Sequence, residues 1–526
     1  MIVVSGIRIP LGASEGDAVE RACSMIKIPS GSISDHKLRR VSYDARHGRV
    51  STVCSVILTL KDGGIERELS NSIPFVSLME KTELKPIMGD EPLHTRPVIA
   101  GFGPAGMFAA YLLSLYGYRP IVVERGGEMD ERVRAVERFF ELGELDGKSN
   151  VQFGEGGAGT FSDGKLTSRI NDPLCDFVIE TFLRLGAPKD IATKAKPHIG
   201  TDKLRDIVKA MRREIVKNGG EVRFNSILDG LLVKDKRLCG VSVNGEKMDA
   251  AVAVLACGHS ARDTFSVTAN AGLTLLAKPF SVGARIEHLG VEVNRSLYGD
   301  AYKNPLLPNA EYNFSAQLNG RGVYTFCMCP GGLVVPAASE SGGVVVNGMS
   351  NFLRDGKNAN SALVVSVGEG EFGKNPFAAI EFQRRLEKAA FAAGKGGYKA
   401  PAADVGSFLD KRVGLNIKSV EPSYSLGVAP CDFDGLLGNE IADTMRYGLN
   451  EFSKRADFFR SRDAILTGVE TRTSSPVRIL RTDTREAENA DGVYPCGEGA
   501  GYAGGIMSAA VDGLKTAKAI IERFRA

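Results

Sequence analysis

One stretch of the chain, residues 97 to 125, constrains the fold more than any other. Its sequence is PVIAGFGPAGMFAAYLLSLYGYRPIVVER. A short apolar segment (98–100) is followed by a glycine-rich turn, an apolar run that favours a helix, and a second short apolar segment (121–123) that ends at Glu124. This order of strand, turn, helix, strand and acid is typical of a βαβ unit that binds a dinucleotide.

The turn carries three glycines, Gly101, Gly103 and Gly106. The first allows a tight turn out of the strand, the second lets the main chain approach a pyrophosphate, and the third lets the helix pack closely on the strand. The helix that begins near Pro104 and Ala105 presents free N–H groups to a diphosphate. Glu124 is suited to accept hydrogen bonds from ribose hydroxyls, and we expect Arg125 to belong to the same site.

A membrane-spanning helix or an ordinary buried helix is the alternative for this stretch, because most of its residues are apolar. A transmembrane helix needs ~20 consecutive apolar residues. The sequence Gly-Phe-Gly-Pro at 101–104 breaks a helix near its start. We therefore reject this alternative.

Composition limits what surrounds the βαβ unit. With 526 residues the chain is long enough for two or three domains. Its 66 Lys and Arg against 63 Asp and Glu leave a net charge of +3, too small a field to favour nucleic acid or an anionic membrane. Nine scattered cysteines indicate a reducing compartment, and the opening residues MIVVSGIRIP have too short an apolar run for a signal peptide. We expect a cytoplasmic protein.

Residues 1–84 are predicted to form a small α/β domain of their own. Residues 2–9 alternate between apolar and other side chains, as in a strand. Ser14 and Asp17 have the spacing of a capping box for a helix that runs to about Ile26.

A β-hairpin is predicted next, from residues 37–45 and 49–60 with a turn at His47 and Gly48. Tyr43 lies among basic side chains, which are Lys37, Arg39, Arg40, Arg46 and Arg49. This face is suited to bind RNA, but a solvated strand face explains it better. Residues 80–96 are predicted to be a proline-rich linker into the βαβ unit.

The segment 150–170, NVQFGEGGAGTFSDGKLTSRI, contains two motif matches that we decline. Residues 154–159 match G-x-G-x-x-G by letter, but turn-forming residues follow where a helix should open. Residues 159–165 match the start of a P-loop, but Leu166 stands where a Ser or Thr should reach a magnesium ion. We predict instead a loop that lies against a flat ring system, with a mobile surface loop as the alternative. Its predicted binding residues are Gly156, Gly157, Thr160 and Ser162.

Further helices and strands continue the α/β pattern. Helices are predicted at about 128–142 and at 201–217, the second with Thr201 as its N-cap. Strands are predicted at 221–228 and 250–256.

The second of these strands leads into Cys257, Gly258 and His259, and we include Gly258 among the binding residues. His198 and His259 could each be functional. A single histidine near the end of a strand or helix is more often an ordinary hydrogen-bonded residue.

Residues 263–474 break this pattern and are predicted to form a β-rich domain inserted into the first. Residues 278–288 alternate as in a strand of a sheet with one exposed face. Further strands are predicted at 322–335 and 342–349, and a helix at 376–393.

Cys327, Met328 and Cys329 lie in this β-rich region, in the string TFCMCPGG. Two thiols one residue apart on a strand face the same side, so the pair is a candidate for redox chemistry or for metal binding. A full zinc site needs two more ligands, and the sequence offers no second close pair of Cys or His. Two simply buried thiols remain the alternative.

The C-terminal segment 491–508, DGVYPCGEGAGYAGGIMS, returns to the opening pattern of strand, glycine turn and helix. Glu498 can accept a hydrogen bond from a sugar-alcohol hydroxyl. The helix that begins near Gly505 and Ile506 runs to about Arg523 and points its positive end at a developing anion.

Together, the three separated glycine motifs resemble the glutathione-reductase-like class of FAD-dependent oxidoreductases. The strings KPHIGTDKL, RIEH, FCMCPGG, GVETRTSSPVRI, PCGEGAGYAGG and SYDAR are similar to a family of largely uncharacterised bacterial FAD-dependent dehydrogenases, also labelled NAD(P)/FAD-dependent oxidoreductases. The similarity covers nearly the whole chain. It implies that the first glycine motif holds the FAD pyrophosphate, Glu124 the adenosine ribose, Gly497 and Glu498 the ribityl portion, and Gly505 with Ile506 the pyrimidine edge of the flavin.

The implied fold is α/β, with a Rossmann-like FAD-binding domain (95–262 and 475–526), the inserted β-rich substrate domain (263–474) and the small N-terminal domain (1–84). The implied function is that of an FAD-dependent dehydrogenase that transfers a hydride between the flavin and an unidentified organic substrate. The candidate catalytic groups are Arg285, Glu287, His288, Cys327, Cys329 and Arg472.

A second βαβ fingerprint for NAD(P)H and a C-x₄-C redox pair, both typical of flavoprotein disulfide reductases, do not occur in the sequence. Any NAD(P)H would therefore reach the flavin without a dedicated fold. Two alternatives remain at this point. One is a flavin-containing RNA-binding or RNA-modifying protein, and the other is a regulatory module in which FAD is purely structural.

Overall fold

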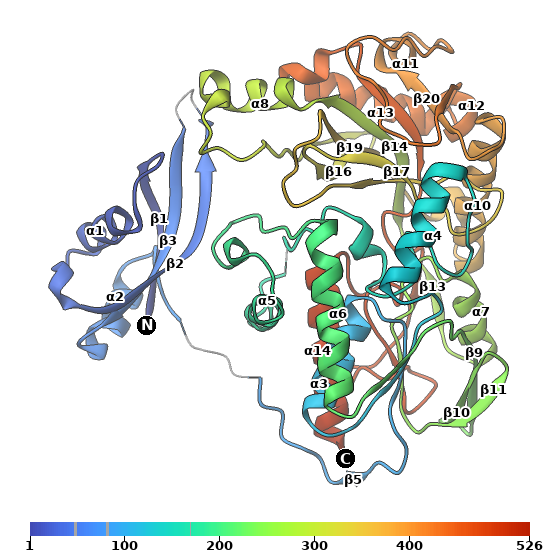
Figure 1. Ribbon diagram of the computed structural model, residues 1–526, viewed down its shortest axis with the longest axis horizontal. Coiled ribbons are helices and arrows are strands. Elements are labelled where there is room, and N and C mark those ends of the chain that lie inside the picture. Colours follow the sequence, from blue (N-terminus) through green and yellow to red (C-terminus); the bar gives the residue numbers. More distant parts are fainter. Residues whose placement is uncertain (47–49, 80–83, 169) are drawn as a thin grey trace.

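Three sheets organise the computed structural model, and each comes from a different part of the chain (Figure 1). The structure describes residues 1–46, 50–79, 84–168 and 170–526. The mixed α/β class is confirmed. In the described residues, no helix is both long enough and apolar enough to span a bilayer.

The N-terminal unit is a four-stranded antiparallel sheet with two helices, in the order β1(Ile2–Pro10), α1(Glu15–Ile26), β2(Ile33–Asp44), β3(Ser51–Leu60), α2(Gly63–Ser72) and β4(Val76–Leu78). The strands lie in the order β2-β3-β1-β4, which is the βαββαβ arrangement of a ferredoxin-like fold.

The predicted capping box of α1 is confirmed, since Ser14 Oγ accepts from Asp17 N (3.2 Å) and Asp17 Oδ2 accepts from Ser14 N (2.7 Å). The predicted hairpin is also confirmed, because Asp44 pairs with Ser51. Its turn at His47 and Gly48 lies outside the described residues, as does Arg49.

Part of the predicted linker, residues 80–83, is also outside the described residues. Beyond it, β5(Glu91–Pro92) pairs with β25(Phe524–Arg525) at the C-terminus. β2 touches the rest of the chain, where Val41 N donates to Thr193 O (2.7 Å) and Ala195 N donates to Val41 O (2.8 Å).

The parallel-sheet unit has five strands in the order β24(Val493–Pro495), β12(Ala253–Leu255), β6(Val98–Ala100), β7(Ile121–Val123) and β8(Glu221–Arg223). All neighbouring strands are parallel. Numbered along the chain, this is the order 3-2-1-4-5 of doubly wound nucleotide-binding sheets, in which the order reverses between β6 and β12. Ligands bind such sheets at the carboxyl ends of the strands at that point.

The helices of this unit are α3(Pro104–Leu115), α4(Met129–Leu142), α5(Leu174–Arg184), α6(Thr201–Lys217) and α14(Ile506–Arg523). Figure 1 shows α3, α6 and α14 side by side. A Cβ at Gly513 would collide with the carbonyl of Ala105, so this glycine lets α14 pack closely on α3. An antiparallel sheet of β9(Leu228–Lys234), β10(Arg237–Val243) and β11(Glu246–Asp249) precedes β12.

Two sequence predictions for this unit are wrong in detail. The strand predicted at 221–228 is interrupted, because β8 ends at Arg223 and β9 begins at Leu228. Thr201 is not the cap of α6. Gly200 occupies that position, and Thr201 Oγ1 instead donates to the carbonyl of Thr160 at 2.6 Å.

The seven-stranded unit follows in the chain and lies above the parallel sheet in Figure 1. Its strands are, in sheet order, β15(Ser315–Leu318), β16(Arg321–Cys329), β19(Asn358–Val367), β14(Phe280–Leu289), β22(Ile465–Glu470), β20(Ala400–Asp404) and β21(Val428–Pro430). The longer helices around it are α8(Gly290–Tyr298), α10(Pro376–Ala393) and α13(Asn439–Ser453).

Shorter elements complete this region. The pair β13(Leu275–Ala277) and β23(Val477–Ile479) joins the two ends of the segment that builds the seven-stranded unit. α7(Arg262–Asn270) contributes Phe265 to an apolar core shared with the parallel sheet. The strand predicted at 322–335 is in fact two strands, because β16 ends at Cys329 and β17(Leu333–Pro336) begins after Pro330 and two glycines. β17 pairs with β18(Val346–Met349).

The predicted exposed face of the strand at 278–288 is wrong. In β14, Ser281, Arg285 and Glu287 are all buried, like the apolar residues that alternate with them. β18 and the segment around Ser423 cover this polar face and supply its hydrogen-bond partners.

Candidate functional site

The N-terminal ends of α3 and α14 meet at the carboxyl edge of the parallel sheet. Gly103 and Gly505 are their N-cap residues, and neither helix end has a side-chain cap. The loop that contains Gly156 to Gly159 joins the two ends. A Cβ at Gly157 would lie 2.8 Å from Gly103 Cα, and a Cβ at Gly159 would lie 2.9 Å from Ile506 Cγ1. The three glycine motifs therefore form one surface.

Two glycines of the first motif serve the packing of the protein itself. A Cβ at Gly106 would collide with the carbonyl of Gly101, and one at Gly101 with the carbonyl of Ala256 at the end of β12. Gly101 also has φ +101°, in the region that favours glycine. Gly497 is likewise required by the packing of the protein, since a Cβ at this position would lie 2.6 Å from Ala105 Cβ.

Gly103 is different, because nothing in the protein requires a glycine there. Its φ of −83° suits any residue, and the nearest described atom to a Cβ would be Gly157 Cα at 3.6 Å. At Gly258 and Gly505, no described atom lies within 4 Å of where a Cβ would be. These positions leave a cradle in front of two uncapped helix ends, and its free N–H groups and partial positive charge suit a diphosphate.

Glu124 lies at the end of β7 and is 5% exposed. Its Oε1 accepts from the backbone N–H of Gly126 (3.1 Å) and Gly154 (2.9 Å), and its Oε2 accepts from Phe102 N (2.8 Å). Glu124 therefore ties the first glycine turn to the loop at Gly154. One acceptor position on Oε2 remains for a hydroxyl. This tying role was not apparent from the sequence.

Arg125 is occupied by other parts of the chain. Its Nη2 donates to Asp263 Oδ1 at 2.7 Å, and its guanidinium lies 4.4 Å from the centre of the Phe153 ring. The structure thus places Arg125 beside α7 as well as beside the glycine loop.

Arg132 on α4 is a site residue that the sequence analysis missed. It is 0% exposed and donates to five backbone carbonyls, those of Asn150, Val151, Gly154, Glu155 and Gly157. Burial lowers the pKa of Arg132 to about 9. A sequence signal existed, since Arg132 shares the buried face of the helix with Met129, Val136 and Phe139 at helical spacing.

The hydroxyls of the same loop turn inward. Thr160 is fully buried, and its Oγ1 has no hydrogen-bond partner among the described residues. Ser162 Oγ donates to the carbonyl of Gly159 at 2.6 Å and accepts from Gly164 N at 3.1 Å. The loop is thus a packed element that Arg132 holds against α3.

Glu498 stands at the start of α14, where its Oε2 accepts from Gly505 N at 3.2 Å. The pKa of Glu498 is raised to about 7, mainly by burial and to a smaller extent by Cys327. The hydrogen bond from Gly505 N–H and the charge of Lys278 lower this pKa but do not cancel the rise. His259 Nε2 lies 3.9 Å from Glu498 Oε1, and burial, with Arg472 and Arg262 nearby, lowers the pKa of His259 to about 3.

Gly497 is held from behind by Asp512 of α14, whose Oδ2 accepts from Gly497 N at 2.8 Å. Arg481 and Arg485 each lie 2.8 Å from Asp512 Oδ1. Burial alone would raise the pKa of Asp512, but the two guanidinium groups lower it to about 2.

Arg285 and Glu287, on the polar face of β14, are fully engaged with the protein. Arg285 donates to Glu470 Oε2 (2.6 Å), to the carbonyl of Cys327 (2.8 Å) and to Asn360 and Asn347. Glu287 accepts from Ser423 Oγ at 2.6 Å and from Asn358. Both residues fix the strands of the sheet.

His288 is wrong as a candidate for proton transfer. It is 1% exposed between Phe458 and Phe459, with ring centroids 4.9 and 5.1 Å away. Within the described part of the chain neither ring nitrogen has a hydrogen-bond partner, and burial lowers its pKa to about 3. His288 therefore belongs to an aromatic core.

Arg472 belongs to a buried ionic cluster between the two large sheets. Its Nη2 lies 3.0 Å from Glu387 Oε2, and Arg262 Nη2 lies 2.7 Å from Glu387 Oε1. Arg262 also binds Glu340 at 2.8 Å. Since Arg262 is on α7 and Glu387 on α10, the cluster fixes one unit to the other.

Cys327 and Cys329 lie at the end of β16 as free cysteines. Cys327 is partly exposed, Cys329 is buried, and Cys329 Sγ donates to the carbonyl of Cys327 at 3.4 Å. Lys165 Nζ, from the glycine loop, donates to the carbonyl of Met328. This contact joins the glycine loop to β16 beside the thiol pair. No group of three or more His, Cys, Asp or Glu suited to a metal occurs among the residues that the structure describes.

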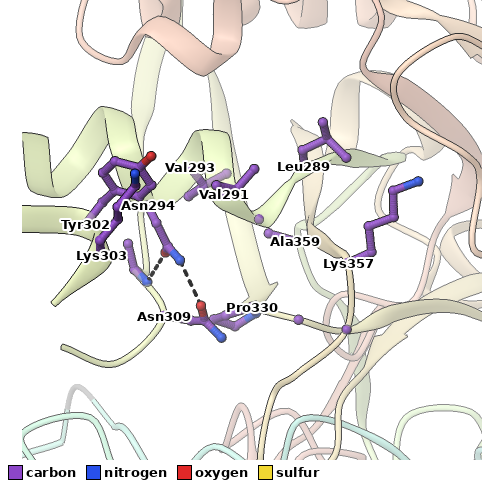
Figure 2. Close-up of a pocket in the computed structure, with 14 residues that line it drawn as sticks. Leu289, Val291, Val293, Asn294, Tyr302, Lys303, Asn309, Pro330, Lys357 and Ala359 are labelled. Carbon is purple, nitrogen blue, oxygen red and sulfur yellow. Dashed lines mark hydrogen bonds between the residues drawn. The ribbon is translucent and has the colours of Figure 1, made fainter. Parts of the chain in front are cut away.

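A cavity of about 510 Å³ lies away from this surface, between α8 and the turns at Pro330 and Lys357 (Figure 2). Asn294 Nδ2 donates to Asn309 Oδ1 at 2.9 Å on its wall. None of the predicted binding residues lines this cavity.

Two comparisons relate the chain to known proteins. A protein of Clostridium beijerinckii, described as an uncharacterized protein, is 44% identical over 529 residues that cover 99% of each chain. Residues 279–473 match the family model described as FAD-dependent protein, C-terminal domain-like. The chain belongs to the same family as the Clostridium beijerinckii protein. FAD is its cofactor. The cradle in front of α3 and α14 fits the diphosphate of this group.

Comparison with solved structures gives remote similarities. The flavin-dependent brominase Bmp2 has 13% identity and a TM-score of 0.35, with coverage of 82% of this chain and 80% of the other. A geranylgeranyl bacteriochlorophyll reductase-like protein of Thermoplasma acidophilum has 13% identity and a TM-score of 0.34, with coverage of 81% and 77%. CtdE in complex with FAD has 11% identity and a TM-score of 0.32, with coverage of 82% and 84%. These TM-scores are too low to carry an argument.

Proposed function

We propose that the protein is an FAD-dependent oxidoreductase of the glutathione-reductase-like class, which transfers a hydride between FAD and an organic substrate. One observation carries the proposal. Two uncapped helix ends, at Gly103 and Gly505, meet across an open cradle, and Lys165 of the adjoining glycine loop binds the carbonyl of Met328 beside the thiol pair of β16. When bound, FAD supplies the two-electron chemistry.

In this proposal the chain binds the cofactor along the whole glycine surface. Gly103 and the N-terminus of α3 hold the diphosphate, and Glu124 keeps an acceptor for a ribose hydroxyl. Glu498 and the N-terminus of α14 hold the flavin end. We also propose the domain organisation predicted from the sequence: an N-terminal domain (1–84), an FAD-binding domain in two parts (95–262 and 475–526) and an inserted substrate domain (263–474). The substrate is held under the seven-stranded sheet.

The proposed partners are the small-molecule substrate and, in some reactions, NAD(P)H that reaches the cofactor without a dedicated fold. The proposed location is the cytoplasm. The RNA alternative gains no support from the N-terminal unit. Its central strands, β1 and β3, contain no aromatic residue, whereas sheet-based RNA binders stack bases on aromatic side chains of such strands.

Gly103→Val tests the proposal. A valine suits φ −83°, and its Cβ would make only an ordinary contact, 3.6 Å from Gly157 Cα, while its methyl groups reduce the open space of the cradle. We expect the purified variant to lose FAD, measured as flavin released on denaturation, while the unfolding midpoint of the FAD-free protein stays unchanged.

Gly31→Val is the matched control, because a Cβ at Gly31 has no described atom within 4 Å and Gly31 lies in the N-terminal unit, outside the cradle. It should keep a full complement of FAD. A Gly103→Val protein that still carries stoichiometric FAD would refute the proposed site. Wild-type protein that turns over no reductant or oxidant after FAD loading would refute the proposed activity.

A further inference from the structure

The thiol pair on β16 has an unusual backbone. On a regular strand, residues two apart face the same side with Cα atoms ~6.6 Å apart, close to the ~6.8 Å limit for a disulfide. Here the register with β19 shifts between Phe326 and Cys329, and Cys327 has φ +44°. This β-bulge interrupts the regular strand, and Cys329 Sγ turns back to donate to the carbonyl of Cys327 at 3.4 Å. The two thiol side chains also interact with each other, so they are neighbours that can form a disulfide.

The two thiols differ in access. Cys327 is partly exposed beside the exposed ring of Phe326, whereas Cys329 is 0% exposed. A reachable thiol followed by a shielded one is the arrangement of an attacking and a resolving cysteine, because a mixed disulfide formed on the first is released by the second.

Charged groups from several elements face Cys327. Arg285 of β14 donates to its carbonyl at 2.8 Å, and Lys165 of the glycine loop donates to the next carbonyl. The acidic groups near it are Asp163, Glu470 and Glu498. The hydrogen bond from Cys329, and then Arg285 and Lys165, hold the pKa of Cys327 well below that of an ordinary thiol, while the same pairing raises the pKa of Cys329. Of the two thiols, Cys327 is therefore the one favoured to ionise first.

We propose that Cys327 and Cys329 form a redox-active dithiol that reduces a low-molecular-weight disulfide. The Cys327 thiolate attacks one sulfur of the disulfide, forms a mixed disulfide and expels one thiolate. Cys329 then loses its proton, attacks Cys327 Sγ and expels the second thiolate. The protein pair is oxidised by two electrons, and the disulfide is reduced to two thiolates with release of one proton. The inference rests on the proposed function for the return of electrons to the pair in later turnovers.

The test follows the thiols of the protein as purified, with Cys239→Ser as background because Cys239 is exposed on β10. Dithiobis-nitrobenzoate is the probe disulfide, and intact mass with peptide mapping is the readout. We expect the background protein to lose two hydrogens at the peptide with Cys327 and Cys329 and to keep no adduct there. With Cys329→Ser added, the adduct should stay on Cys327. With Cys327→Ser added, this peptide should remain unmodified.

The rate at which the probe reacts at the peptide with Cys327 and Cys329 is then measured against pH in the Cys239→Ser protein, which keeps the hydrogen bond from Cys329. An ordinary thiol with a pKa of ~8.5 slows by roughly 75-fold between pH 8 and pH 6, whereas a thiolate with a pKa of ~6 or lower slows by less than about twofold. Loss of the adduct in the Cys329→Ser protein, or a 75-fold pH dependence, would overturn the inference. FAD content is measured on the same samples, so failure of the thiol chemistry is separated from failure of the proposed function.

Discussion

Arg132→Met should detach the glycine loop that the proposed FAD site depends on. The guanidinium donates five hydrogen bonds to carbonyls of residues 150–157 and is completely buried. Methionine keeps the apolar stem and fills similar space, but it offers none of these donors. The loop then loses the contacts that hold Gly157 against Gly103.

The magnitude follows from two opposing terms. Five hydrogen bonds from a charged donor, at ~1.5 kcal/mol each, amount to a gross loss of roughly 7 kcal/mol. Removing the buried cation also removes its desolvation penalty, which is several kcal/mol. We therefore expect the free energy of unfolding of the FAD-free protein to fall by about 3–5 kcal/mol. Arg132→Lys has three donors for five carbonyls, so its free energy of unfolding should lie between those of wild type and Arg132→Met.

Urea unfolding of the FAD-free proteins measures the stability, and flavin released on denaturation measures retention of FAD. Arg138→Met is the matched control, since Arg138 is exposed on the same helix, and it should change stability by less than about 0.5 kcal/mol. The reasoning fails if the free energy of unfolding of Arg132→Met lies within about 1 kcal/mol of the wild-type value and the variant keeps its FAD. Arg132 would then not hold the loop in place.

Three further substitutions test other parts of the site. Glu498→Gln should flatten the pH dependence of stability in FAD-free protein. The pKa of this carboxyl is about 7 in the folded protein, above its unfolded value, so its contribution to stability is complete below pH ~4.5 and is lost as the pH rises to about 7. We expect a loss of about 1–3 kcal/mol, since the side chain is 24% exposed and solvent screens part of the effect. Equal pH slopes of stability in wild type and Glu498→Gln would contradict this. His288→Leu should retain FAD and activity and gain about 1–2 kcal/mol near neutral pH, because it removes two unpaired buried nitrogens; loss of activity in folded, FAD-loaded protein would restore His288 as a candidate. Glu387→Gln should lower the free energy of unfolding by about 3–5 kcal/mol, measured with urea, since it leaves the buried Arg472 without its counter-charge and Arg262 with Glu340 alone. Glu381→Gln, exposed on the same helix, should be near neutral.

The parts of the fold that sequence predicted well are those set by short-range patterns. The strand at 98–100, the helix end at Gly103 and the strand at 121–123 agree with β6, α3 and β7, because the glycine turn and the flanking apolar runs are all local signals. The capping box at Ser14 was found for the same reason.

The parts that failed depend on residues far away in the chain. The alternation of β14 predicted a solvated face, and no local signal reveals that Asn347 and Ser423 return to cover it. Likewise α2 begins with two glycines and presents few apolar residues, so it was missed, although Asp62 caps it. Arg132 was overlooked because its partners are backbone carbonyls, which leave no trace in side-chain motifs.

Contacts between the glycine loop and the seven-stranded unit explain how β16 keeps a fixed position relative to the glycine surface. Arg354 is bound to the buried Asp163 of the loop, and Lys165 of the same loop is bound to the carbonyl of Met328. Buried ion pairs add little net stability, because desolvation offsets their attraction, but a misplaced partner leaves an uncompensated charge that costs several kcal/mol. Such contacts therefore favour a single orientation of β16 relative to the glycine loop.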